Sequence, residues 1–224
     1  MKVLLFGATG MVGQGVLREC LLDPGVERVV AVRRRSTGQS HPKLHEIVLD
    51  NLMNSSPVEK EVGGYDACFF CLGVSAAGMT EPDYRRQTYD LTLALARPLA
   101  RDNPGMTFVY VSGTGTDGTG RSRWMWARVK GETENALLAL PFRAAYMFRP
   151  GFIQPLHGVR SRTGWYRALY AVLAPLYPAL KLLFPGQLTT TEQVGRAMLA
   201  VVRRGWSTRW LENRDINALA ASGG

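Results

Sequence analysis

Short apolar runs alternate along most of the chain with longer segments in which apolar residues recur every three or four positions. The runs predict buried strands at residues 3–6, 29–32, 44–49, 67–72, 107–111 and 144–148. The periodic segments predict helices at residues 14–22, 80–101 and 124–140. Strands that alternate with helices form βαβ units, so the pattern predicts an α/β fold with a doubly wound parallel sheet.

The first strand runs into a glycine-rich turn that is followed by a helix. Gly7, Gly10 and Gly13 stand three residues apart. Glycines let phosphate oxygens approach the backbone, and the free N–H groups at a helix N-terminus attract an anion. The turn therefore predicts a dinucleotide site, whereas the alternative is a glycine-rich turn in an unrelated parallel sheet. The predicted binding residues here are Gly7, Thr9, Gly10, Met11, Val12 and Gly13.

The end of the second strand indicates which dinucleotide is bound. NAD-binding turns carry an acidic residue there, which accepts hydrogen bonds from the ribose hydroxyls. This chain has Arg33, Arg34 and Arg35 instead. Guanidinium groups bind phosphate oxygens through two charge-assisted hydrogen bonds, so Arg33 and Arg34 predict NADP(H). The alternative is a solvated basic loop.

Composition excludes several other classes of protein. The net charge is +9, but the basic residues are spread along the chain, which argues against a nucleic-acid-binding arm. Cys68 and Cys71 form a C-x-x-C inside an apolar run, where they are expected to be small core residues rather than a redox pair. His41, His45 and His157 are scattered, so no metal site is predicted. The chain starts at a core strand, and we expect a cytoplasmic protein.

Together these motifs resemble those of the short-chain dehydrogenase/reductase superfamily, in particular its atypical NmrA-like and epimerase-like branch. Further matches are the A-T-G at 8–10, Asp50, the L-G at 72–73, the V-S at 111–112, the V-K-G-E at 129–132 and the R-P-G at 149–151. The resemblance implies a Rossmann-type fold. It places Asp50 and Asn51 near the adenine, Gly73 near the adenosine ribose and Lys130 on the nicotinamide ribose. Leu72 and Pro150 complete the expected cofactor-binding set.

The catalytic tyrosine of the superfamily is absent from the position that it should occupy. The resemblance assigns Ser112 and Lys130 as catalytic residues, but the Y-x-x-x-K tyrosine is Trp126, whose indole cannot exchange a proton in this range. Three hypotheses remain open. The protein could reduce a small carbonyl substrate with another donor such as Tyr84 or Tyr89, it could be a non-catalytic NADP(H) sensor or regulator, or its substrate could need no proton from the enzyme.

The residues after the R-P-G motif are expected to build the substrate side. We predict an NAD(P)-binding domain over 1–155 and a small, mostly helical substrate or lid region over 156–224. The apolar, aromatic stretch 164–184 fits a lid, a homodimer surface or a peripheral contact with the inner face of a membrane. Thr189 is expected to open the last helix, 210–211 to form a short closing strand, and 218–224 to be frayed.

Overall fold

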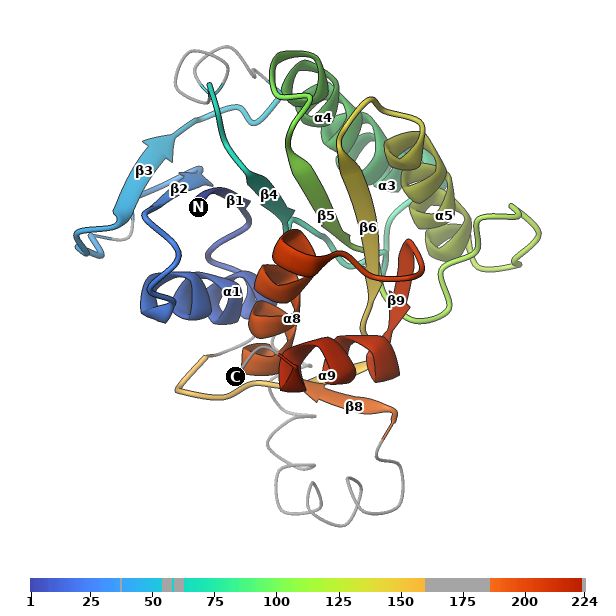
Figure 1. The fold of residues 1–224 in the computed structure, drawn as a ribbon. Helices are drawn as coiled ribbons and strands as arrows, with labels where there is room; N and C mark the ends of the chain where they lie inside the picture. Colours follow the sequence, from blue (N-terminus) through green and yellow to red (C-terminus); the bar gives the residue numbers. More distant parts are fainter. Residues whose placement is uncertain (37, 54–57, 59–62, 160–185, 223–224) are drawn as a thin grey trace.

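A seven-stranded parallel sheet forms the centre of the protein in the computed structural model, which describes residues 1–36, 38–53, 58, 63–159 and 186–222 (Figure 1). Its strands are β1 (Lys2–Phe6), β2 (Arg28–Arg33), β3 (Leu44–Val48), β4 (Ala67–Phe70), β5 (Thr107–Val111), β6 (Ala144–Arg149) and β9 (Trp210–Glu212). They lie in the order β3-β2-β1-β4-β5-β6-β9. The strand order reverses between β1 and β4, which confirms the predicted doubly wound, Rossmann-type fold.

Helices cover both faces of the sheet, as Figure 1 shows. One layer consists of α1 (Met11–Leu22), α8 (Thr191–Arg204) and α9 (Asn213–Ala221), and the other contains α3 (Glu81–Arg85), α4 (Leu91–Asp102) and α5 (Met125–Leu138). Alternate residues of β1 pack against the two helix layers. Val3 and Leu5 pack in the core beneath α1 and α8, whereas Leu4 and Phe6 pack in the core beneath α4 and α5. This two-sided burial explains why the strand is continuously apolar.

Helices α1 and α8 pack closely because glycines lie at their contact. A Cβ atom on Gly15 would lie 2.6 Å from the Cβ of Thr191, and one on Gly195 would lie 2.7 Å from the Cγ of Glu19. The C-terminal residues are thus built onto the same sheet as the nucleotide-binding turn, since β9 also pairs with β6. The division into 1–155 and 156–224 stays a prediction.

Several elements differ from those that the sequence predicts. The helix expected over 80–101 is interrupted by a π-helical turn, η1 (Arg86–Asp90). The helix after the glycine turn begins at Met11, ahead of the predicted start, because Gly10 is its N-cap. Two short strands that were not predicted, β7 (Phe152–Gln154) and β8 (Leu188–Thr190), pair in parallel beside the main sheet.

The prediction for the C-terminus is wrong in part. Helix α8 is not the last helix, because α9 follows it and extends to Ala221 over most of the segment expected to be frayed. The capping box formed by Glu212 and Asp215 begins α9, and Ile216 and Leu219 bury its inner face. The threonine that caps α8 is Thr190, one residue after the predicted Thr189, and its hydroxyl accepts the N–H of Gln193 at 3.0 Å.

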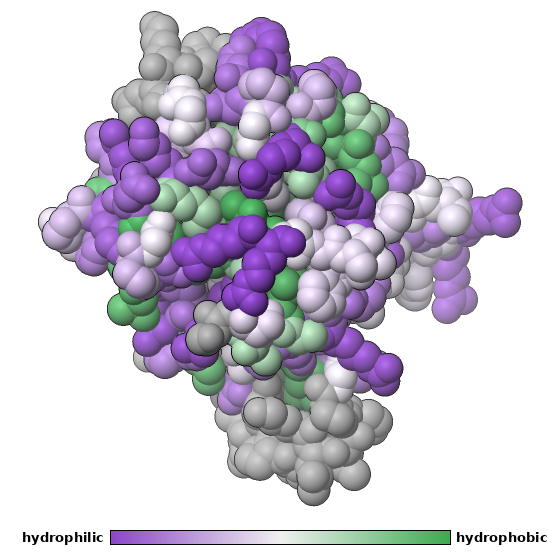
Figure 2. Space-filling model, in the orientation of Figure 1, coloured by the Kyte–Doolittle hydropathy of each residue, from purple (hydrophilic) through white to green (hydrophobic). Residues whose placement is uncertain are grey.

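The stretch 164–184 lies outside the described residues, so its three interpretations remain predictions. Within the part of the chain that is described, no helix is both long and apolar enough to cross a membrane. Hydrophilic side chains cover much of the face seen in Figure 2, and apolar side chains emerge between them in several separate places.

Candidate functional site

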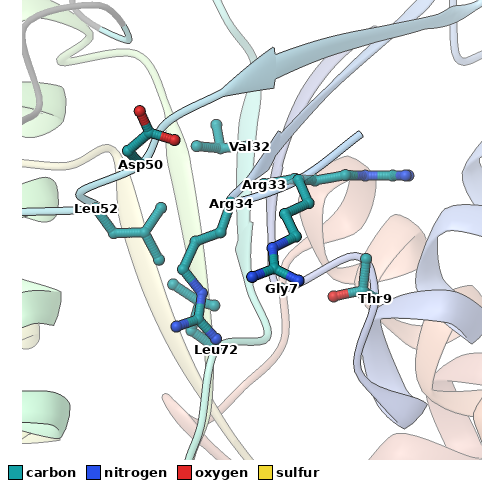
Figure 3. A pocket seen from close by; sticks show the side chains of 9 residues that line it. Gly7, Thr9, Val32, Arg33, Arg34, Asp50, Leu52 and Leu72 are labelled. Atoms are coloured by element: carbon teal, nitrogen blue, oxygen red, sulfur yellow. The ribbon is translucent and has the colours of Figure 1, made fainter. Parts of the chain in front are cut away.

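A cavity of about 610 Å³ lies at the carboxyl ends of the first four strands. Figure 3 shows Arg33 and Arg34 at the end of β2, with Thr9 on one side of the cavity and Asp50 and Leu52 on the other. Gly7, Val32, Arg35 and Leu72 complete its lining. Parallel sheets bind ligands beyond their carboxyl ends at the point where strand order reverses, and this cavity lies at that point.

The glycine turn at the base of the cavity has the close backbone contacts that the motif requires. Gly7 has φ of +80°, and its carbonyl accepts the N–H of Gly10 at 2.9 Å. A Cβ atom on Gly13 would lie 2.1 Å from that same carbonyl oxygen. Helix α1 begins directly after Gly10, so the N–H groups of its first residues, Met11 and Val12 among them, point out of the helix N-terminus. The turn can therefore hold a pyrophosphate.

The two arginines predicted to bind a phosphate differ in their surroundings. Arg33 is buried and forms an ion pair with Glu46 of β3, and burial lowers the pKa of its guanidinium. Arg34 is exposed at the cavity. Of these two side chains, Arg34 is the one placed to meet a ligand phosphate, whereas Glu46 offsets the charge of Arg33.

Only some of the residues assigned to the adenosine end of the cofactor line the cavity. Asp50 and Leu72 line the cavity from the ends of β3 and β4. Their neighbours Asn51 and Gly73 follow them along the chain, and the Asn51 side chain accepts the backbone N–H of Met53 at 2.9 Å. Asp50 and Leu72 are thus placed to contact an adenosine bound above the glycine turn.

A second cavity, of about 320 Å³, contains the position of the missing tyrosine. Trp126 and Lys130 reach it from α5 and Tyr84 from α3, while residues 74–77 form the rest of the lining. Tyr84 is buried, and this burial raises the pKa of its phenol. Tyr89, the other donor considered from the sequence, stacks under the Arg85 guanidinium, whose Cζ lies 4.2 Å from its ring centroid.

Lys130 and Ser112 are brought together, but the serine hydroxyl is engaged elsewhere. The Lys130 ammonium donates to the Ser112 carbonyl, and burial lowers the pKa of Lys130 to about 8. The Ser112 hydroxyl donates to the buried carboxylate of Glu134 at 2.5 Å. Glu134 was missed in the sequence, although a carboxylate four residues after a helical lysine signals a shared helix face.

Pro150 lies behind this site rather than in either of the two cavities. Its carbonyl accepts the N–H of Thr114 at 3.0 Å, which ties the loop after β5 to the end of β6. Cys68 and Cys71 are neutral thiols, because burial raises the pKa of Cys68 well above its usual value and that of Cys71 to about 12. The described residues contain no group of three His, Cys, Asp or Glu side chains that could hold a metal ion.

These observations define the class of fold: a Rossmann-type α/β fold, similar to that of NAD(P)-binding proteins of the short-chain dehydrogenase/reductase kind. The model of the semialdehyde dehydrogenase NAD-binding domain matches residues 2–93. A Bordetella bronchiseptica enzyme, WbmF, solved with NAD⁺, superposes with a TM-score of 0.68 at 16% identity over 98% of this chain and 76% of its own. A UDP-N-acetylglucosamine 4-epimerase from Methanobrevibacter ruminantium gives 0.68 at 15% identity over 94% and 75%. These solved structures confirm the fold.

Curated relatives then identify the family. The mitochondrial protein FMP52 of Saccharomyces cerevisiae is 32% identical over 169 residues, which cover 73% of this chain and 69% of that protein. The mitochondrial fmp52 of Emericella nidulans is 33% identical over 159 residues, and the match spans 68% of this chain but only 66% of the relative. The chain belongs to the Fmp52 family.

The expectation of a cytoplasmic location is wrong by these comparisons, because the Fmp52 relatives are named as mitochondrial proteins. The expectation rested on the core strand at the start of the chain and on ordinary composition. Those features report on folding, and a compartment is chosen by signals that the fold does not contain.

Proposed function

We propose that the protein binds NADP(H) and reduces a small carbonyl compound in the cavity formed by Trp126, Lys130 and Tyr84. The observation that carries the cofactor assignment is the cavity above the glycine turn, where Arg33 stands at the position of the acidic residue of NAD-binding turns and the exposed Arg34 and Arg35 follow it. A 2′-phosphate held there would gain charge-assisted hydrogen bonds from a guanidinium. The relatives' NAD⁺ complexes support dinucleotide binding in general.

The two cavities together indicate how a bound dinucleotide would be oriented. A dinucleotide whose adenosine lies against Asp50 and Leu72, and whose pyrophosphate lies on the glycine turn, would extend toward the cavity of Lys130. The nicotinamide supplies the hydride when it is bound. Lys130 would hold ribose hydroxyls, and Trp126 would close the space above the ring. Access of bulk water to the reacting atoms would thereby be limited.

Cofactor binding is tested by the thermal unfolding of the full chain with NADP⁺ and NAD⁺. A ligand at about 100 times its dissociation constant stabilises the folded state by ~2.7 kcal/mol. For a chain of this size that raises the melting temperature by about 5–10 °C. We expect the larger shift with NADP⁺. Equal shifts would contradict the role of the arginines, and no shift with either nucleotide would contradict dinucleotide binding.

A non-catalytic NADP(H) sensor is the second candidate, and the state of two residues at the site favours it. The Ser112 hydroxyl donates to Glu134 and Trp126 replaces the tyrosine, so two groups of the usual acid/base set are engaged or absent. NADPH absorbance followed with a panel of aldehydes, ketones and quinones separates the candidates. A reductase consumes NADPH with at least one substrate, whereas a sensor consumes none and binds the oxidised and reduced cofactors with different affinities.

A further inference from the structure

Glu134 is a fully buried carboxylate on α5, and its position is unusual for an acid. It accepts the Ser112 hydroxyl at 2.5 Å and the Arg149 guanidinium through Nε at 3.0 Å and Nη2 at 2.5 Å. Removing a carboxylate from water costs several kcal/mol, which only close hydrogen bonds and an opposite charge offset. The same space filled with apolar side chains could be equally stable, so stability alone does not account for Glu134.

Ser112 connects Glu134 to the lysine of the second cavity. Its hydroxyl donates to Glu134, and its carbonyl accepts the Lys130 ammonium. Lys130 and Glu134 are four residues apart on α5, so both side chains leave the same helix face. The two charged groups are therefore linked to each other through the first residue after β5.

Arg149 connects Glu134 to the C-terminal part of the chain. Its Nη1 lies 3.6 Å from Oε1 of Glu212, the N-cap of α9, and its carbonyl accepts the Thr114 hydroxyl at 3.0 Å. The loop after β5, the end of β6 and the start of α9 are thus linked through one arginine, by its backbone carbonyl and its guanidinium. A change at Glu134 would be transmitted to the residues that carry Lys130 and Ser112.

The electrostatic surroundings of Lys130 contain few charges. Burial lowers the pKa of Lys130 to about 8, and the Glu134 carboxylate opposes this decrease. Among the residues that the structure describes, the other titratable groups near this region are the phenols of Tyr84 on α3 and Tyr110 on β5, whose pKa values are both raised by burial, and Arg149 on β6, which is paired with Glu134. Glu134 is therefore the carboxylate that favours the charged form of Lys130.

We propose that Glu134, itself oriented by Arg149, is a positioning residue that fixes the Lys130 ammonium in the wall of the second cavity through Ser112 and keeps it charged through its own carboxylate. The inference rests on the proposed function only in that Lys130 would contact the bound dinucleotide. Glu134 itself touches neither cavity. Its effect on a ligand is transmitted through Lys130 and Ser112.

The first test measures Lys130 directly and needs no ligand. The chain has five lysines, so ¹³Cε-lysine labelling gives a simple NMR spectrum in which Lys130→Arg assigns the signal. Glu134→Gln keeps the shape and one acceptor but removes the charge, and we expect the pKa of Lys130 to fall by about 1 unit or more. The matched control is Glu19→Gln, which neutralises a buried carboxylate paired with Arg196 on the other side of the sheet and should leave Lys130 unchanged. An unchanged Lys130 titration in folded Glu134→Gln overturns the proposal.

A second variant keeps the proposal testable if Glu134→Gln does not fold. Ser112→Ala removes the hydroxyl but leaves the Glu134–Arg149 pair intact. We expect the dissociation constant for NADP⁺, measured by calorimetry, to rise about 2- to 10-fold, the range for one lost hydrogen bond. A dissociation constant equal to that of the wild type overturns the positioning role of the serine link. If the wild type binds no dinucleotide, the proposed function fails, and the Lys130 titration still decides the inference.

Discussion

Trp126 stands where the resemblance predicts the tyrosine of the Y-x-x-x-K motif. It lies four residues before Lys130 on α5 and lines the same cavity. A phenol at this place would have its pKa lowered by the lysine charge, whereas an indole has no proton to exchange in this range. The substitution thus removes the acid/base group and leaves the lysine.

Replacing this tryptophan should therefore create or increase turnover. We expect Trp126→Tyr to raise the rate of NADPH oxidation with simple aldehydes or ketones by on the order of 100-fold, the usual contribution of a general acid. The measurement is NADPH absorbance under saturating cofactor. Trp126→Phe is the control, since it makes the same space without the hydroxyl. Equal rates for the two variants would show that a phenol at 126 is not positioned for proton transfer.

Arg34 should determine the preference between the two dinucleotides. It is exposed at the cavity, and hydrogen bonds between charged groups contribute about 1.5–3 kcal/mol. We expect Arg34→Ala to raise the dissociation constant for NADP⁺ by about 10- to 100-fold and to leave that for NAD⁺ nearly unchanged. Titration calorimetry with both nucleotides provides the comparison.

The control for this experiment is Arg97→Ala on α4, an exposed arginine that lines neither cavity. It removes the same amount of net charge, so any general electrostatic effect on nucleotide binding appears in both variants. A parallel loss of NAD⁺ and NADP⁺ affinity in Arg34→Ala would mean that Arg34 contacts a part common to both cofactors.

The contact between α1 and α8 shows how packing joins the nucleotide-binding turn to the C-terminal part. Both helices rest on the same core, and glycines bring their backbones together. Helix α1 begins at the glycine turn, and α8 lies beside it in the same layer (Figure 1). The position of the turn thus depends on residues almost 200 positions away in sequence.

A methyl group at this contact should destabilise the fold. The Cβ of Gly15→Ala would lie 2.6 Å from both the Cβ and the carbonyl oxygen of Thr191. Overpacking of this kind costs about 1–3 kcal/mol, which lowers the melting temperature by roughly 2–12 °C. Gly105→Ala is the control, because a Cβ there meets nothing within 4 Å. Scanning calorimetry should show no decrease for the control, and an equal decrease in both would contradict close packing of α1 on α8.

Across the whole molecule, ionised carboxylates tie together segments that are distant in sequence. Asp23 at the end of α1 accepts the Arg203 guanidinium of α8 at 2.6 Å, and Glu192 on α8 lies 2.7 Å from the ring nitrogen of His157. Asp117 instead holds its own loop, because it accepts two hydrogen bonds from Thr119 and one from the backbone of Ser122. These contacts lower the pKa of all three acids, that of Asp117 to about 2.

Stability should therefore fall in acid. A carboxyl whose pKa is lower in the folded state stabilises the fold above its unfolded pKa and loses that contribution as the pH drops toward the folded value. For Asp117 this window runs from 3.8 down to about 2. We expect the urea midpoint to fall between pH 5 and pH 3, and to fall less steeply in Asp117→Asn. Identical slopes for the variant and the wild type would contradict the contribution of Asp117.

Local patterns in the sequence were sufficient for the sheet and for the phosphate-binding turn. The inner strands of this parallel sheet are buried on both faces, so each of them is a short apolar run that can be recognised without its neighbours. The glycine spacing is equally local, because Gly10 and Gly13 allow close contacts with Gly7 within one strand–turn–helix unit. Gly7 itself also meets a second strand, since a Cβ atom there would lie 2.6 Å from the backbone of Cys71 at the end of β4. The replacement of tyrosine by Trp126 is likewise visible in a single helix.

Tertiary structure decided what each side chain at the site is free to do. The sequence could not distinguish Arg33 from Arg34, because the ion pair that engages Arg33 comes from Glu46 on the neighbouring strand. It could not show that the Ser112 hydroxyl is bound to Glu134, since that contact joins the end of β5 to α5 and depends on Arg149 from β6. Burial and pairing arise when separate elements meet, and they determine charge and availability where residue type alone cannot.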